Sequence, residues 1–309
     1  MMLLRLLVVG VMCTVCTIAQ ARTTEDISVG DIVELSLSQL HPTQASIGYD
    51  QVWYKLGRYS VDRKKLFDDI CEANGQRGVM GSVKSASLLN SDSYNCEARV
   101  GTDKDEMKTV VIAPNGQYYL TDGHHTLNAF YEMPKGGAHF RIHLLVAKDY
   151  RSLPNMTQFW HAMKEDGNVW LYNQSAQTIK VSELPSSLGL TNFANDQYRA
   201  LMYFSRGVAW NKPPSPVPFL EFYWANEIRD KVALKEFDLN DKAGYERAIR
   251  AVSQVILTLK THNVGGSKRS TTQMGQFRQF SQKGLDKLLK SNGKVDNMLR
   301  YKHQLKMKQ

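Results

Sequence analysis

A short polar run beginning at Thr121 carries the side chains of this 309-residue chain that are best suited to chemistry. An imidazole has an ordinary pKa of about 6.5, so His124 or His125 could take up or release a proton near neutral pH. Asp122 could orient one of the imidazoles or bind a cation. A simpler interpretation stays open: Asp122 caps a helix, Gly123 makes a turn and the histidines hydrogen-bond within a loop.

The flanking sequence predicts a β-hairpin before this run and a helix after it. β-Branched and aromatic residues fill 108–112 and 117–120, on either side of a Pro-Asn-Gly turn. Apolar residues then recur with helical spacing from Leu127. The first N–H groups of a helix lack internal partners and carry the positive end of its dipole, so a phosphate is stabilised there. The sequence therefore predicts an anion site in which Gly123 permits close approach and Thr126 adds a hydroxyl.

The N-terminal residues 1–21 have the pattern of a secretory signal peptide. A basic start precedes an apolar run and a small-x-small cleavage site. The run is short for a membrane span, although an uncleaved anchor stays open, and no later segment is long and apolar enough to cross a bilayer. We expect an exported protein, periplasmic or secreted, with no transmembrane segment in the mature chain.

Removal of this peptide leaves Cys71 and Cys96 as the cysteines of the mature chain. Two cysteines in an oxidising compartment predict one disulfide, with two buried free thiols as the alternative. Closing a loop of this size stabilises a fold by about 3 kcal/mol.

Positive charge is concentrated at the C-terminus. Residues 260–309 hold twelve Lys or Arg and two acidic residues, a net charge of +10 against +9 for the whole chain. Such a basic tail could meet nucleic acid or an anionic surface. The alternative is a solvated helix face that keeps the protein in solution.

The order of the predicted elements favours an α+β fold. Strands are expected at 31–37, 108–112, 117–120 and 140–147, and helices at 49–56, 61–73 and 156–163. No regular strand-helix repeat and no Gly-x-Gly-x-x-Gly motif precede residue 180, so a compact α+β domain over 22–180 is expected. Helical periodicity then predicts a mostly helical region with a basic tail at 190–309. The Gly-Gly-Ser-Lys run at 265–268 lacks the spacing and preceding strand of a phosphate loop and is assigned to a basic loop.

Two motifs together resemble the ParB/sulfiredoxin superfamily, and more narrowly its exported branch of ParB-like nucleases. The first is Leu-x-Pro-Thr-Gln, which ends at Thr43 and Gln44, and the second is Asp-Gly-His-His, which starts at Asp122. The resemblance covers roughly residues 31–172. It implies a small α+β domain that presents the second motif at a helix N-terminus, against phosphate groups of a nucleotide or nucleic acid. Thr43 and Gln44 would then add donors from a facing loop.

Departures from the known motifs narrow the implied activity. His124, His125 and Thr126 replace the Glu-Arg-Arg of the ParB box, which argues against CTP binding in the ParB mode. His124 stands where sulfiredoxins have their reactive cysteine. Asp-Gly-His-His also resembles the start of the motif in an archaeal serine kinase, but export argues against a kinase because ATP and ADP are scarce outside the cytoplasm.

The resemblance therefore implies a nuclease that hydrolyses phosphodiesters, with His124, His125 and Asp122 as catalytic residues and Gly123 and Thr126 in the phosphate cradle. Alternatives are a protein that binds nucleic acid or an anionic polymer without catalysis, and a nucleotide-dependent phosphotransferase. No cofactor is certain. Mg²⁺ or another divalent cation held by Asp122 and the substrate phosphate is expected ahead of zinc, because adjacent histidines diverge and no cysteines accompany them.

Overall fold

The predicted hairpin forms the centre of the fold. In the computed structural model, which describes residues 27–307, strand β6 (Lys108–Ile112) pairs antiparallel with β7 (Tyr118–Leu120). They belong to a five-stranded sheet of order β1-β8-β6-β7-β2, and the remaining strands are β1 (Ile32–Ser36), β8 (Arg141–Asp149) and β2 (Leu40–His41). The expected signal peptide, residues 1–21, lies outside the described residues.

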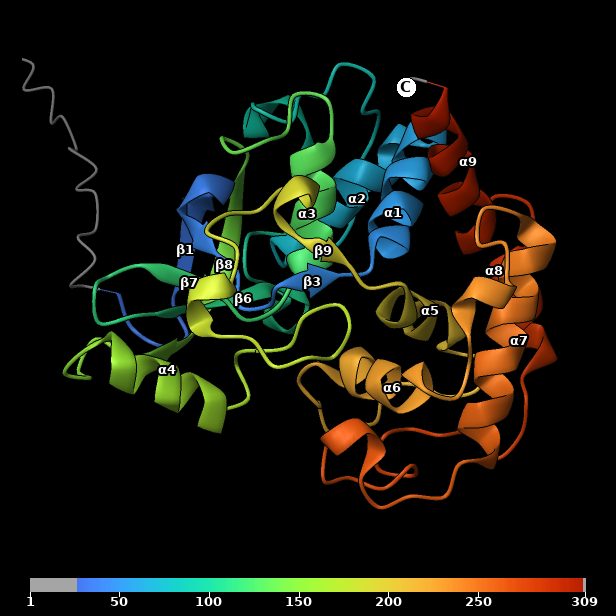
Figure 1. The fold of residues 1–309 in the computed structure, drawn as a ribbon. Helices are drawn as coiled ribbons and strands as arrows, with labels where there is room; N and C mark the ends of the chain where they lie inside the picture. Colours follow the sequence, from blue (N-terminus) through green and yellow to red (C-terminus); the bar gives the residue numbers. More distant parts are fainter. Residues whose placement is uncertain (1–26, 308–309) are drawn as a thin grey trace, which may run out of the picture.

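The sheet is mixed and is covered on both faces. Alternate residues of a strand point to opposite faces, so Val110 faces one core while Val111 faces another. Helix α4 (Met156–Glu165) packs on the Val111 side through Phe159. The opposite face is covered by α1 (Tyr49–Val61), α2 (Arg63–Ala73) and α3 (His124–Glu132) (Figure 1). The expected α+β class is confirmed.

The C-terminal part is helical, as expected, and has a core of its own around Trp210, Trp224 and Tyr245. Its helices are α5 (Gln197–Ser205), α6 (Leu220–Arg229), α7 (Lys242–Thr258), α8 (Gln282–Leu289) and α9 (Lys294–Lys306). The last two occupy the basic segment, which is folded along most of its length (Figure 1). A boundary between residues 180 and 190 stays a prediction.

Helix α9 is fastened to α1 by buried polar contacts. The Lys302 ammonium lies 2.9 Å from a carboxylate oxygen of Asp50, and the Tyr245 hydroxyl donates to the other at 2.9 Å. Gly57 of α1 meets the backbone of α9 so closely that a Cβ atom would lie 1.9 Å from the Asn297 carbonyl oxygen. Helix α1 thus continues through Gly57 to Val61, past the expected end at residue 56.

A disulfide and two short sheets lie outside the five-stranded sheet. The predicted disulfide between Cys71 and Cys96 is confirmed. It lies beside the two-stranded sheet of β4 (Val79–Met80) and β5 (Asn95–Cys96), while β3 (Ser46–Ile47) pairs with β9 (Ala194–Asn195). Within residues 27–307, no helix has both the length and the apolar composition that a bilayer span requires.

Candidate functional site

The polar run lies where the sheet passes into helix α3, as the sequence predicts. Strand β7 ends at Leu120, and the helix begins at His124 with Gly123 as its N-cap. Gly123 has a φ of 99°, in the left-handed region that glycine adopts without strain. A Cβ atom there would also lie 2.7 Å from Cγ of Lys108. Both observations require glycine at this position.

The first turn of α3 has unsatisfied backbone donors. No side chain caps the helix, and the first amide that bonds within it is that of Leu127, which donates to the Gly123 carbonyl at 2.9 Å. Within the described chain, the N–H groups of His124, His125 and Thr126 have no hydrogen-bond acceptor. By contrast, side chains cap α2, α4, α5, α7 and α8. An uncapped first turn favours an anion.

The two imidazoles attach α3 to the loop between β2 and α1. The Thr43 N–H donates to Nε2 of His124 at 3.1 Å, and the Gly48 N–H donates to Nε2 of His125 at 3.1 Å. The Thr43 hydroxyl in turn donates to the Leu120 carbonyl at 2.6 Å. The structure therefore brings the Thr43 motif and the His124 motif into direct contact, and we call residues 43–44 and 122–126 together the α3 site.

These bonds fix the tautomer of both rings. A backbone N–H can only donate, so Nε2 of His124 and His125 must be the unprotonated acceptor and Nδ1 must carry the hydrogen. Within residues 27–307, no hydrogen bond engages Nδ1 of either ring. Each imidazole therefore keeps one N–H donor in reserve.

Burial holds both imidazoles neutral. His124 and His125 are 4% and 7% exposed. Desolvation, with the nearby charge of Arg199, lowers the pKa of His124 to about 3, and the same two causes with smaller ones lower the pKa of His125 well below its usual range. At neutral pH, the unliganded site thus offers neutral N–H donors rather than imidazolium acids.

The remaining predicted residues differ in accessibility. Gln44 is buried, and its side-chain amide donates to the Ser46 carbonyl at 2.8 Å, so one of its two N–H donors is already used. Asp122 is the exposed member: its side chain is 66% exposed and lies 3.8 Å from the Lys108 ammonium. Thr126 is half-buried in the first turn of α3. Asp122 is therefore the carboxylate that solvent or a cation can reach.

Comparison with known proteins identifies the family and a similar fold. A family model described as "Putative ParB-like nuclease" matches residues 33–230. The chain belongs to this family. Among solved structures, the crystal structure of protein Atu1540 from Agrobacterium tumefaciens is similar, with a TM-score of 0.50 and 16% identity over 74% of this chain and 93% of that chain. At that identity the likeness shows the fold alone. No match was found among curated proteins.

The matched region places the α3 site and helices α5 and α6 within the ParB-like domain, and α7–α9 follow it. Two residues that the sequence analysis did not select also belong beside the site. Lys108 lies over Gly123, and Arg199 of α5 is close enough to lower the pKa of both histidines. Lys108 is the first residue of β6, the strand that pairs with β7 before the motif, whereas no sequence signal points to Arg199.

Metal binding by this member of the ParB-like family would depend on Asp122. Among residues 27–307, no three His, Cys, Asp or Glu side chains are grouped so that they could hold a metal ion. Mg²⁺ commonly keeps several waters and binds through one carboxylate and the substrate phosphates. Asp122 fits that mode, because it is an exposed oxygen donor beside the uncapped turn.

Proposed function

We propose that this chain is a nuclease that binds a phosphodiester at the N-terminus of α3 and hydrolyses it. The observation that carries the proposal is the uncapped first turn of α3, with three unpaired N–H groups beside a glycine. Family membership supports nucleic acid as the substrate. A phosphate oxygen at this turn would accept hydrogen bonds from the amides of His125 and Thr126 and from the Thr126 hydroxyl.

The proposed roles follow from accessibility and charge. Asp122 takes the proton from the attacking water or holds a divalent cation that binds this water. The histidines position the Thr43–Gly48 loop through Nε2, and a bound phosphate can accept from Nδ1–H. Because Nε2 of His125 stays bonded to the Gly48 N–H, His125 acts as a neutral hydrogen-bond donor through Nδ1–H, and the leaving oxygen takes its proton from solvent.

We place this activity outside the cytoplasm. The Cys71–Cys96 disulfide supports an oxidising compartment, and residues 1–21 have the pattern of an export signal. Hydrolysis suits that location because it consumes no nucleotide. A phosphotransferase would need a nucleotide donor there.

The test is cleavage of single-stranded DNA, duplex DNA and RNA by the purified chain, with Mg²⁺, Mn²⁺, Ca²⁺ or a chelator. Asp122→Asn should lower the rate by about 10²–10⁴, and His125→Gln, which removes the Nδ1–H donor, should lower it by about 10²–10³. Glutamine is chosen at position 125 because it keeps an acceptor for the Gly48 N–H, whereas alanine would leave that buried donor unpaired. Asp230→Asn, an equal change of charge at an exposed site outside the α3 site, should leave the rate unchanged.

Binding without cleavage is the second candidate, and the burial of both imidazoles favours it. It predicts that the wild type and the Asp122→Asn variant bind the same oligonucleotides and that neither cleaves them with any cation. Cleavage that persists in both variants, with unchanged melting temperatures, would move the reaction away from the α3 site.

A further inference from the structure

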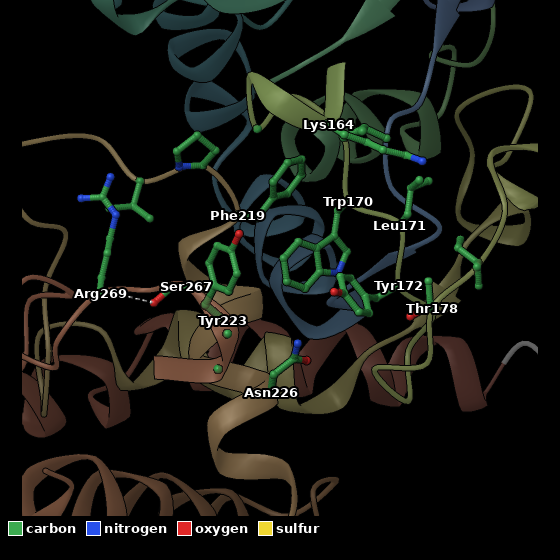
Figure 2. Close-up of a pocket in the computed structure, with 17 residues that line it drawn as sticks. Lys164, Trp170, Leu171, Tyr172, Thr178, Phe219, Tyr223, Asn226, Ser267 and Arg269 are labelled. Carbon is green, nitrogen blue, oxygen red and sulfur yellow. Dashed lines mark hydrogen bonds between the residues drawn. The ribbon is translucent and has the colours of Figure 1, made fainter. Parts of the chain in front are cut away.

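A concave surface lies between the ParB-like domain and the basic segment. It is a pocket of about 650 Å³, with walls from the end of α4 and the chain after it, from the start of α6 and from the loop at 265–269 (Figure 2). The last wall lies beyond the family match, which ends at residue 230. The pocket is therefore completed by a part of the chain outside the ParB-like domain.

Aromatic rings form the floor of this pocket, and we name it the aromatic pocket after Trp170, Tyr172, Phe219 and Tyr223. Ring centroids of Tyr172 and Tyr223 lie 4.8 and 4.9 Å from that of Trp170, and that of Phe219 lies 5.6 Å away. Figure 2 shows Trp170 among the other three rings. Tyr172 is 36% exposed and Tyr223 is half-buried, so a ligand can reach their faces.

The backbone of Phe219 is held in an uncommon conformation at this rim. Its φ of 55° lies in the left-handed region, which residues other than glycine rarely adopt. Such strain persists where the surroundings enforce it, and it often marks ligand sites. Here it directs an aromatic ring toward Trp170.

The cationic side chains and the Asn226 amide that line the pocket are unpaired within the described residues. Lys164 and Arg269 come from opposite walls, and neither cation has a carboxylate partner within residues 27–307 (Figure 2). The amide side chain of Asn226 makes no hydrogen bond within the same residues. Of the residues that line the pocket, all of which are described, none is Asp or Glu. The lining therefore favours an anionic ligand with a flat, apolar part.

The loop at 265–269 contributes a side chain to the pocket and is not a phosphate-binding loop. Its amides are largely satisfied within the protein: the Gly265 N–H donates to a Glu227 carboxylate at 2.8 Å and the Ser267 N–H donates to the Val264 carbonyl at 2.9 Å. Gly265 is required because a Cβ atom there would lie 1.9 Å from the Tyr223 carbonyl oxygen. This loop therefore packs against α6 and places Arg269 at the pocket.

We propose that the aromatic pocket binds an unstacked base of a single-stranded nucleic acid, with Lys164 and Arg269 on the adjoining phosphates. The proposal rests on the proposed function and names its substrate class. A base stacks on exposed aromatic rings whatever its identity, and Asn226 can both donate to and accept from its edge. Bases inside a duplex are stacked on their neighbours and cannot enter a concave pocket.

The aromatic pocket and the α3 site are connected through one residue. The Trp170 N–H donates to the Thr43 carbonyl at 2.8 Å, while the Thr43 N–H donates to His124. Thr43 and Trp170 are both buried, so this connection fixes the wall of the pocket relative to α3, and a single strand would contact the exposed Tyr172 ring rather than Trp170. The pocket would hold the strand, and the α3 site would act on it.

The test measures binding without cleavage, so that its failure is separate from failure of the nuclease proposal. The full chain is titrated, in a chelator, with a fluorescein-labelled thymidine oligomer of about 12 nucleotides, with its duplex, and with an abasic oligomer of equal length. We expect the abasic oligomer and the duplex to bind about tenfold more weakly than the single strand. Tyr172→Ala should weaken binding of the thymidine oligomer about tenfold and leave binding of the abasic oligomer unchanged.

Tyr172→Phe keeps the ring and should bind as the wild type does, which separates stacking from loss of the fold. Equal affinity of the wild type for the thymidine and abasic oligomers would overturn the proposal. Unchanged binding of the thymidine oligomer by both the Tyr172→Ala and the Tyr223→Ala variants would also overturn the proposal. A soluble glycan oligomer that competes for the pocket better than the thymidine oligomer would assign it to carbohydrate instead.

Discussion

In the α3 site both imidazoles are buried and each Nε2 already accepts a backbone hydrogen bond, whereas in the aromatic pocket the cations of Lys164 and Arg269 lack carboxylate partners within residues 27–307. The side chains of the first site are used to hold a loop, which leaves backbone donors for a ligand. In the second, the side chains themselves are available. The difference separates positioning, which needs rigid groups, from affinity, which comes from exposed rings and charges.

The largest effect should come from removing an imidazole of the α3 site. His124→Ala leaves the Thr43 N–H unpaired and a cavity in its place, so we expect the free energy of unfolding to fall by about 2–4 kcal/mol. His124→Gln keeps an acceptor and should cost about 1 kcal/mol. In the aromatic pocket, Arg269→Gln should change stability by less than about 0.5 kcal/mol.

Urea denaturation of the three variants measures this contrast. A His124→Ala midpoint equal to that of the wild type would mean that the imidazole does not hold the loop. The side chain would then be free for chemistry, as the sequence alone suggested.

Acid should destabilise the α3 site before it affects the aromatic pocket. The unfolded chain binds a proton at each histidine below a pH of about 6.5, whereas burial lowers the pKa of His124 to about 3 in the folded chain. Stability therefore falls as the pH falls through this window, by up to about 1.4 kcal/mol per pH unit for each such histidine. His125, His41 and His143 add to the slope because burial lowers their pKa values too.

Melting temperatures between pH 7 and pH 4.5 measure this slope. His124→Gln should reduce the pH dependence of stability by the contribution of one titrating histidine. A slope that is equal in the wild type and in His124→Gln would show that His124 is protonated in the folded chain.

The sequence predicted the α3 site far better than the aromatic pocket, and the reason is locality. Alternating β-branched residues, a Pro-Asn-Gly turn and a glycine before a helical repeat all lie within about 25 consecutive residues, so they determine β6, β7 and the start of α3 directly. The pairing with Thr43 came from the resemblance. Burial of the histidines was missed, because it depends on α1 and α5.

Features formed by segments that are distant in the sequence are not marked by a local sequence pattern. The first helix was expected to end at residue 56, yet Gly57 lies inside α1, where the backbone of α9 approaches. Arg199 acts on the histidines from α5, and the aromatic pocket joins three segments between residues 164 and 269. Tertiary contacts of this kind override local preference, and a single sequence does not show them.

The smallest expected effect is on the salt dependence of binding. It distinguishes binding at the aromatic pocket from binding by the general positive charge of the basic segment. The affinity for single strands falls with salt concentration, and the logarithmic slope is about 0.7 for each phosphate that a cation neutralises. Lys164→Gln with Arg269→Gln should therefore reduce the slope by about 1.4, measured with the thymidine oligomer by fluorescence anisotropy. Arg278→Gln is the matched control, because Arg278 is exposed in the same basic segment and does not line the aromatic pocket. If a diffuse basic surface carries the binding, Arg278→Gln and Arg269→Gln reduce the slope equally. If binding occurs at the aromatic pocket, Arg269→Gln reduces the slope and Arg278→Gln leaves it unchanged.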